Sequence, residues 1–277
     1  MFVGSSSCSR SSLFGCWIEM RLTVVVPTFN EADTIENSLR EIERVLGPEL
    51  SKDTELLIAD DGSDPMPELV ERLKKEIGFA RLELLRNSPP VGKGLSLARA
   101  FERAQGRTVG FLDADLSTPA TYILEALKVL EANEADLYIG SRRAMGANVV
   151  REQFWLKDVL GDALRVGVNA VIFRLGRKYS DTQCGFKFFK NQVAKVLYCN
   201  LVAYDGVTDV EILVRANLLG YRVCERGVEW CDTRESKRSL KRILIGDLKA
   251  ITRIMWHYGV FEKKQIKDLR RFEKTLI

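Results

Sequence analysis

The sequence has a single histidine, His257, and its six cysteines form no Cys-x-x-Cys pair. Zinc clusters need several such ligands at close spacing, so any metal ion would have to bind carboxylate oxygens. The scattered cysteines also do not make the framework of a disulfide-stapled fold, and a reducing compartment is expected. No apolar stretch approaches the roughly 20 residues of a membrane-spanning helix.

Positive charge is concentrated near the carboxyl terminus. Residues 234–277 contain 13 Lys and Arg against 5 Asp and Glu, so this end carries +8 and the remainder −4. The asymmetry indicates an acidic partner, such as a membrane surface, a phosphate or nucleic acid. Nucleic acid is disfavoured because neither interleaved aromatic residues nor a recognised binding module accompanies the charge. Residues 1–19 lack the apolar core of a signal peptide, and we interpret them as a loose tail.

Short apolar strands alternate with helices over the first half of the chain. Strands are predicted at residues 22–26, 55–59, 81–85, 108–112 and 137–140. This alternation predicts an α/β fold with a mostly parallel central sheet and helices on both faces. A capping box at Asp33 and Glu36 predicts the start of the first helix, and Gly47-Pro48 predicts its end. Beyond residue 146 longer helices dominate, and one more strand is expected near 222–230.

Polar residues cluster where three of these strands end. The clusters are Asn30-Glu31, Asp60-Asp61-Gly62-Ser63 and Asp113-Ala114-Asp115. In open parallel sheets, ligands bind beyond the carboxyl ends of the strands. The convergence of three clusters on that edge therefore predicts a binding site there.

Asp113 and Asp115 place two carboxylates on one short loop. Hard cations such as Mg²⁺ and Mn²⁺ take oxygen ligands, keep several waters and often bridge to substrate phosphates. A metal ion held by this pair would neutralise a diphosphate leaving group. The alternative is structural, because Asp residues at strand ends are also common in turns and at the starts of helices.

Two further loops have both a functional and a structural interpretation. Asp60 and Asp61 would accept hydrogen bonds from a base or ribose, or they would form a plain turn in which Ser63 or Asp64 caps the next helix. Lys93, which stands between two glycines, would bring its ammonium and nearby backbone N–H groups to a phosphate. The alternative for Lys93 is an ordinary loop.

Together these clusters resemble glycosyltransferase family 2, whose members have a Rossmann-like GT-A fold. The resemblance rests on three motifs that occur in the family's order: Val25–Glu31, Ala59–Ser63 and Phe111–Asp115. A second set is similar to the branch that makes dolichyl-phosphate glucose or mannose: Gly92–Gly94, Gly140–Arg142, Asp181–Lys187, Asp209–Glu211 and Glu235–Lys237.

The resemblance implies a division of the chain. Residues 20–238 would form the GT-A catalytic domain, with the nucleotide sugar bound by 20–145 and the acceptor by 146–238. A basic, amphipathic helical region would follow at 239–277. Within the domain, nucleotide binding is implied for Pro27, Glu31, Asp60 and Asp61.

The same resemblance implies the residues around the reacting groups. Asp113 and Asp115 would hold the diphosphate through Mg²⁺ or Mn²⁺, and Ser117 stands where some members have a third metal ligand. The side chains implied to surround the phosphates of donor and acceptor are Arg142, Gln183, Lys187 and Lys237.

Four of these residues are the candidate catalytic set: Asp115, Arg142, Lys187 and Lys237. Structural alternatives exist for other members of the same motifs. Gln183 and Phe186 would simply pack in a strand, and Asp209 and Glu211 would be acidic residues favoured by the dipole at a helix N-terminus.

The resemblance implies hexosyl transfer with inversion, from UDP-glucose or GDP-mannose to a polyprenyl (dolichyl) phosphate. A phosphate acceptor is largely ionised near neutral pH, so this reaction needs no strong general base. One alternative is transfer to a hydroxyl of a saccharide or small molecule, with Asp209 or Asp181 as the base. Another is a noncatalytic binding protein with a decayed site, against which the intact Asp113, Asp115 and Lys93 argue.

Residues Ser239–Gly259 are expected to form one amphipathic helix. Its apolar residues recur at helical spacing: Leu240, Ile243, Leu244, Leu248, Ile251, Ile254, Met255 and Tyr258. Arg242, Lys249 and Arg253 lie on the opposite face. Such a helix is typical of binding to an anionic membrane, which would place the chain at the cytoplasmic face, on lipid or beside a membrane-protein partner. The alternative is a helix that covers the protein's own sheet and leaves its basic face in water.

Overall fold

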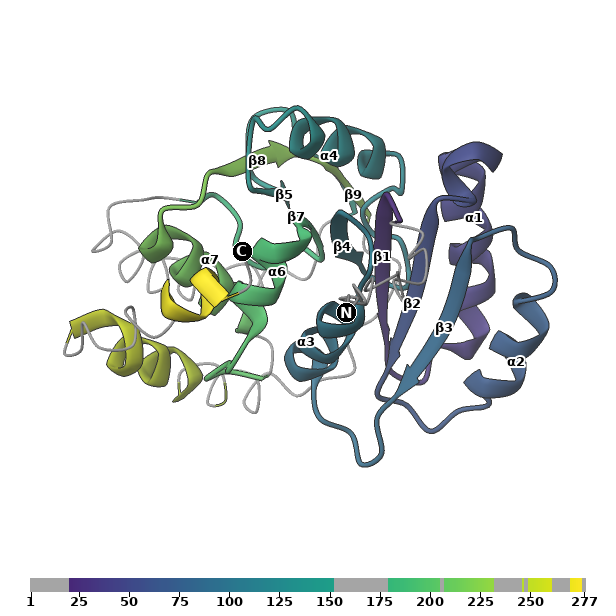
Figure 1. The fold of residues 1–277 in the computed structure, drawn as a ribbon, viewed down its shortest axis with the longest axis horizontal. Helices are drawn as coiled ribbons and strands as arrows, with labels where there is room; N and C mark the ends of the chain where they lie inside the picture. The colour runs from purple at the N-terminus through teal and green to yellow at the C-terminus, as the bar shows by residue number, and fades with distance from the viewer. Residues whose placement is uncertain are drawn as a thin grey trace, which may run out of the picture.

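The computed structural model describes residues 20–151, 179–204, 207–231, 246, 249–260 and 270–275. The expected tail at 1–19 and the candidate residue Lys237 lie outside these ranges. Within them, a central sheet separates two layers of helices, as Figure 1 shows.

The sheet has seven strands in the order β3-β2-β1-β4-β7-β5-β8. Their bounds are β1 (Leu22–Thr28), β2 (Thr54–Asp60), β3 (Arg81–Arg86), β4 (Thr108–Leu112), β5 (Leu137–Ser141), β7 (Phe186–Lys190) and β8 (Val223–Gly227). Neighbours pair in parallel except at β7, which runs antiparallel to both β4 and β5. The expected mostly parallel sheet is confirmed.

Helices cover both faces of this sheet (Figure 1). One layer is α1 (Ala32–Ser51), α2 (Met66–Leu73) and α4 (Tyr122–Glu131), and the other is α3 (Lys93–Arg103), α6 (Asn191–Tyr198) and α7 (Thr208–Leu219). Residues of β1 alternate between the two layers, since Val24 and Val26 pack with α1 and Val25 packs with α3. A strand buried on both faces explains its continuous apolar sequence.

The first helix differs from its prediction at both ends. The capping box is wrong: α1 begins at Ala32, and Asp33 lies inside its first turn. The first backbone N–H is capped from another loop, because Ala32 N donates to Asp64 Oδ2 at 2.8 Å. Asp64 therefore caps α1 instead of α2. At the other end Gly47, with φ 69°, kinks the helix at the predicted stop, and one further turn continues beyond it.

The single strand expected near 222–230 is two strands. After β8 the chain enters β9 (Glu229–Cys231), which pairs in parallel with β6 (Asn148–Arg151) in a separate small sheet. Cys231 N donates to Ser117 O at 2.9 Å, so this small sheet lies against the loop that carries Asp115.

The described part of the C-terminal helix packs on the protein. Residues 249–254 are helical and continue into a π-helical segment, η1 (Met255–Val260). Ile251, Ile254 and Tyr258 are buried in the cluster that contains α7, so here the apolar face covers the protein's own core. For residues 251–258 the structure therefore favours the alternative, in which the helix covers the protein itself and its apolar face is not available to lipid. No helix among the described residues is long and apolar enough to cross a membrane.

Candidate active site

The Asp113 loop begins directly at the carboxyl end of β4. Asp113 N donates to Gly185 O at 3.1 Å, which extends the pairing of β4 with the β7 side of the sheet. The Asp113 carboxylate lies against Gly185, where an added Cβ would be 1.7 Å from Asp113 Oδ2. Only glycine leaves room for the carboxylate in this position.

The second carboxylate of the loop is oriented by its own turn. Asp115 Oδ1 accepts hydrogen bonds from Ser117 N at 3.0 Å and from Ser117 Oγ at 2.8 Å. The carbonyl of Ala114, between the two aspartates, accepts a hydrogen bond from Ser38 Oγ on α1. The loop is thus held from both sides while its two carboxylates stay partly exposed.

The ammonium group of a lysine side chain pairs with this loop. Lys93 Nζ, at the start of α3, lies 2.6 Å from Asp113 Oδ1, and the two side chains are 37% and 40% exposed. Asp113 and Asp115 offer hard oxygen ligands, which suit Mg²⁺ or Mn²⁺. Within the described residues no three His, Cys, Asp or Glu side chains gather as a metal site, so water and phosphate oxygens would complete the coordination.

The ammonium groups of two lysines lie near the aromatic ring of Phe111 on β4. Lys93 Nζ and Lys187 Nζ lie 5.0 Å and 5.6 Å from the centroid of Phe111. Lys187 is fully buried, and its ammonium pairs with Asp209 Oδ1 at 2.9 Å and donates to Cys184 O at 2.7 Å. Burial opposes the charge of Lys93, but its carboxylate neighbours, led by Asp113, raise its pKa above the ordinary value. Lys93 is therefore a charged part of the site at neutral pH.

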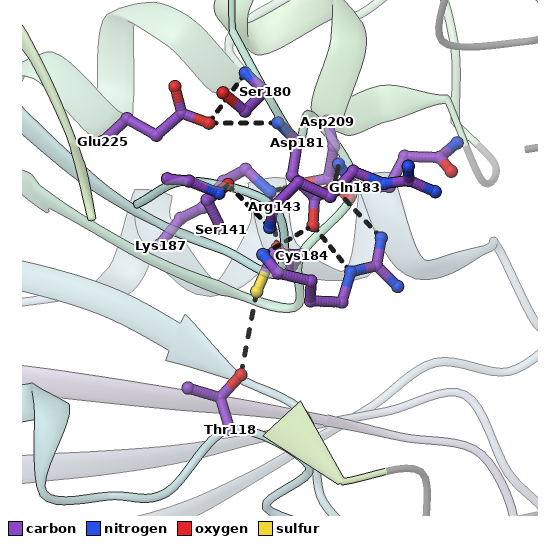
Figure 2. Close-up of polar contacts among 12 residues, drawn as sticks. Thr118, Ser141, Arg143, Ser180, Asp181, Gln183, Cys184, Lys187, Asp209 and Glu225 are labelled. Atoms are coloured by element: carbon purple, nitrogen blue, oxygen red, sulfur yellow. Dashed lines mark hydrogen bonds and ion pairs between the residues drawn. The ribbon is translucent and has the colours of Figure 1, made fainter. Parts of the chain in front are cut away.

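Arg142, which follows β5, is locked onto one carboxylate. Its Nε and Nη2 donate to Asp181 at 2.6 Å and 3.0 Å, and its backbone N–H donates to the same side chain. Figure 2 shows Asp181 held in turn by Glu225, which accepts hydrogen bonds from Ser180 N and Asp181 N. Burial alone would raise the pKa of Asp181, but Arg142 lowers it to about 2. The pair is a fixed ion pair across the physiological pH range.

Other groups of the protein bind the oxygens of the Asp60 carboxylate, at the end of β2. It is 0% exposed and accepts hydrogen bonds from Thr28 Oγ1 at 2.9 Å and Gly62 N at 3.0 Å. Arg86 on β3 adds an ion pair, with Nε 2.6 Å from Asp60 Oδ2. Such a carboxylate stabilises the turn, and a contact of Asp60 with nucleotide stays a prediction.

Asp61 supports the loop that carries Lys93. Its carboxylate accepts hydrogen bonds from Val91 N at 3.1 Å and from Gly92 N at 2.6 Å. Gly92 has φ 90°, a value that favours glycine, and is the last residue before α3. Asp61 therefore links the end of β2 to the start of α3, and so to Lys93.

Comparison with known sequences fits this arrangement. The model of glycosyl transferase family 2 matches residues 23–196, from β1 into α6. The chain belongs to this family. The matched region contains both aspartate loops and most of the site described above.

Several curated members of the family are similar to the chain. The glycosyltransferase AglD of Haloferax volcanii is 32% identical over 250 residues, which are 87% of this chain and 38% of AglD. A dolichyl-phosphate beta-glucosyltransferase of Dictyostelium discoideum is 28% identical over 88% of this chain and 77% of its own length. The enzyme of the same name from Saccharomyces cerevisiae is 27% identical over 80% of this chain and 70% of its own length. This chain thus spans well under half of AglD and about three quarters of the other two.

Comparison with solved structures confirms the fold. Glucosyl-3-phosphoglycerate synthase from Mycobacterium tuberculosis, in complex with Mn²⁺, UDP and glucosyl-3-phosphoglycerate, has a TM-score of 0.62 at 18% identity, over 89% of this chain and 84% of that one. TarS of S. aureus, in complex with UDP-GlcNAc, has a TM-score of 0.57 at 14% identity, over 90% and 70%. The Rossmann-like GT-A fold expected from the sequence is confirmed.

Other residues implied by the family motifs occupy varied positions. Pro27 lies within β1, and Glu31 stands directly before α1, where its Oε2 is 3.4 Å from Phe29 N. Gln183 is partly exposed, and its backbone N–H donates to Asp181 Oδ1 at 3.0 Å. The structure brings these residues to the edge of the sheet that carries both aspartate loops, and their contacts with ligands stay predictions.

The sequence analysis assigned no role to two residues of the site, although Gly185 lies within the Asp181–Lys187 motif. Gly185 matters because of its contact with Asp113, and Trp230 matters because the guanidinium carbon of Arg142 lies 5.3 Å from its ring centroid. Each contact joins segments more than 70 residues apart in the chain. Spacing along one element cannot reveal such pairs.

Proposed function

We propose that this chain transfers a hexose from a nucleotide sugar to a polyprenyl (dolichyl) phosphate, with inversion at the anomeric carbon. Family membership supports glycosyl transfer, and the names of two relatives support dolichyl phosphate as the acceptor. One feature of the site carries the proposal: two separate cationic side chains adjoin one carboxylate loop. Lys93 pairs with Asp113, and Arg142 contacts Trp230, whose neighbour Cys231 is bonded to the Asp115 loop. Two cations fit two phosphate groups, one on the donor and one on the acceptor.

The donor diphosphate is assigned to the Asp113 loop. Bound Mg²⁺ or Mn²⁺ would supply positive charge to the leaving diphosphate. Asp113 and Asp115 would hold that ion, and Lys93 would leave Asp113 and pair with a phosphate oxygen. Asp61 would fix the backbone from which Lys93 reaches the diphosphate, because it binds Val91 N and Gly92 N.

The acceptor phosphate is assigned to Arg142. Its side chain is 27% exposed and contacts Trp230, and the next residue, Cys231, is hydrogen-bonded to the loop that carries Asp115. A phosphate nucleophile is already ionised, so the protein needs to orient it and screen its repulsion from the donor. The ammonium group of Lys187 is buried, and we propose that its role is to hold the Asp209 carboxylate in place. Lys237 lies outside the described residues, and a contact with phosphate stays a prediction.

Ion pairs disfavour the alternative of a hydroxyl acceptor. That reaction needs a general base, for which Asp209 and Asp181 are the candidates. Asp209 is 13% exposed and pairs with Lys187, while Asp181 is 4% exposed and has a pKa of about 2. A carboxylate with so low a pKa is a weak base.

A peripheral membrane contact would bring the chain to its lipid acceptor at the cytoplasmic face. The outward side of the C-terminal helix presents Lys249, Arg253 and Trp256, whose side chain is 74% exposed. Basic residues favour anionic lipid, and tryptophan favours the membrane interface. We propose that this outward face, and not the packed apolar face, meets lipid or a membrane-protein partner. Vesicle flotation tests it: Lys249→Glu with Arg253→Glu should abolish low-salt binding to anionic vesicles, and unchanged flotation would refute it.

The proposed reaction is tested with a panel of radiolabelled donors. UDP-glucose and GDP-mannose are each supplied with Mg²⁺ or Mn²⁺ and a detergent-solubilised polyprenyl phosphate, and label is counted in the organic extract. We expect one donor to give extractable, mild-acid-labile product. Turnover of a saccharide acceptor without turnover of polyprenyl phosphate would establish the hydroxyl alternative, and no transfer to either would favour a binding protein.

A further inference from the structure

Hydrogen bonds fix the strand β9 at the residues before and after Trp230. Glu229 N donates to Tyr122 Oη at 3.0 Å, and Cys231 N donates to Ser117 O at 2.9 Å. Between them, Trp230 stands opposite Val149 of β6. The backbone of Trp230 is therefore tied both to α4 and to the loop that carries Asp115.

The indole of Trp230 contacts the guanidinium of Arg142. The guanidinium carbon lies 5.3 Å from the ring centroid, within the usual range for a cation–π contact. Asp181 binds the Nε–Nη2 edge of the same group. A planar guanidinium held along one edge and against one aromatic ring has its remaining orientation largely fixed.

The ion pair alone leaves one motion open. A bidentate carboxylate sets the direction of the Nε–Nη2 edge but allows the guanidinium plane to tilt about it. Contact with the indole restricts that tilt. The two donors of Nη1, which lie outside the bidentate pair, are then aimed in one direction.

We infer that Trp230 is a positioning residue, which holds the plane of Arg142 so that Nη1 faces the acceptor phosphate. This inference rests on the proposed function only for the identity of the anion. Because Cys231 is bonded to the Asp115 loop, one short strand also fixes the distance between the Arg142 group and the metal-binding carboxylates. Donor and acceptor phosphates would thereby keep their relative positions.

The alternative for Trp230 is direct contact with the sugar or the lipid chain. The two roles differ in one measurable way. If Trp230 acts through Arg142, its removal has no further effect once Arg142 is already changed. If it contacts the substrate itself, its removal has the same effect in either background.

The experiment is a double-mutant cycle on the full chain with detergent-solubilised polyprenyl phosphate. We expect Trp230→Leu to raise the acceptor KM about 3- to 10-fold, from loss of a cation–π contact, with the donor KM unchanged. Trp230→Phe should restore most of the loss because it retains an aromatic face. In the Arg142→Gln background, Trp230→Leu should change the acceptor KM less than about twofold. Glu229→Gln, on the same strand, is the matched control.

A second measurement does not depend on turnover. The Nε–H of Arg142, assigned by its loss in Arg142→Gln, is followed by NMR in ¹⁵N-arginine-labelled protein. We expect Trp230→Leu to remove its ring-current shift and to speed its exchange with water by about fivefold or more, while Trp230→Phe retains most of its protection.

The kinetic cycle and the exchange measurement together decide whether the inference holds. Equal effects of Trp230→Leu in both backgrounds, or unchanged exchange of the Arg142 Nε–H, would overturn the inference. Non-additive kinetics with faster exchange would support it. If the wild type does not transfer to polyprenyl phosphate at all, the proposed function fails, and the exchange measurement still decides whether Trp230 orients Arg142.

Discussion

Two aspartate pairs at the same edge of the sheet have opposite environments. Asp60 and Asp61 follow β2, whereas Asp113 and Asp115 follow β4, and β1 lies between these strands. Asp60 is 0% exposed and binds three groups of the protein, but the Asp113 side chain is 40% exposed and pairs with the partly exposed Lys93. The pairs therefore differ in how much of their hydrogen-bonding capacity remains for a ligand.

Because of this difference, we expect Asp60 to contribute to the stability of the fold and Asp113 to the reaction. A carboxylate whose oxygens already accept several hydrogen bonds contributes to the fold, and its loss leaves buried partners without an acceptor. A partly exposed carboxylate that pairs with a partly exposed lysine contributes less to the fold, and we propose that Asp113 exchanges this lysine for a metal ion. We expect substitutions at the two loops to change different measurements.

The largest expected effect is on activity at the exposed loop. Asp115→Ala should lower kcat/KM more than about a hundredfold, since a preorganised charge partner of the diphosphate is lost. The free energy of unfolding should change by less than about 1 kcal/mol, because no core cavity opens. Radiometric transfer assays and urea unfolding measure the two. Full activity of this variant, or of the wild type in EDTA, would contradict the assignment of a metal site.

Gly185→Ala tests whether that loop depends on its neighbour. An added Cβ would lie 1.7 Å from Asp113 Oδ2, so Asp113 must shift. A displacement of about 1 Å near the reacting groups can lower the rate about a hundredfold, and we expect a loss of roughly 10- to 100-fold in kcat. Steady-state kinetics measure it. Gly246→Ala, where an added Cβ would meet nothing within 4 Å, is a control for glycine replacement in general, and wild-type rates for Gly185→Ala would show that Asp113 is not placed as described.

Asp60→Asn should change stability in preference to activity. The substitution removes the charge that pairs with Arg86 and weakens the bonds to Thr28 and Gly62. We expect a loss of about 2 kcal/mol in the free energy of unfolding, in the range for breaking a buried pair with a partly exposed partner. Denaturant unfolding checks it. If stability is unchanged and the donor KM rises more than tenfold, Asp60 binds nucleotide directly, as the family resemblance implies.

Asp181 is an intermediate case, because it is buried but pairs with a partly exposed arginine. Its pKa falls from 3.8 to about 2 in the folded protein, chiefly through Arg142 acting against burial. A lowered carboxyl pKa stabilises the fold above the unfolded pKa, and this stabilisation is lost as the pH falls from about 4 towards 2. We expect it to be about 2 kcal/mol at neutral pH.

The difference in unfolding free energy between wild type and Asp181→Asn measures this contribution. It should be largest at pH 7 and should shrink as the pH falls through 4 towards 2. A difference that does not depend on pH would mean that the contribution of Asp181 is not electrostatic.

The strands of the sheet could be predicted from the sequence, but which carboxylates bind groups of the protein and which stay partly exposed could not. Apolar strands ending in polar residues predicted β1, β2 and β4 and the edge where the site lies. The same pattern could not separate Asp60 from Asp113, because the partners of Asp60, such as Arg86, come from other elements. Local capping rules failed for the same reason, since Asp64 caps α1 from a distant loop and the predicted box at Asp33 does not form.

The C-terminal helix shows the same limit. Its spacing predicted an apolar face, but spacing does not say whether protein or lipid covers that face. In the structure Tyr258 donates to Glu211 at 2.8 Å and accepts from Arg215 at 2.8 Å, and these buried partners on α7 fix the helix to the protein. Only the fold of the preceding 200 residues could reveal that docking.

Binding of Mn²⁺ tests the contrast between the two loops most directly, because it requires no turnover. Free Mn²⁺ is followed by electron paramagnetic resonance in the presence of UDP or GDP, for the wild type, Asp115→Asn and Asp60→Asn. We predict that the wild type and folded Asp60→Asn bind Mn²⁺ with affinities within about threefold, and that Asp115→Asn binds at least about tenfold more weakly. Equal binding by Asp115→Asn and the wild type, or loss of binding in folded Asp60→Asn, would contradict the account.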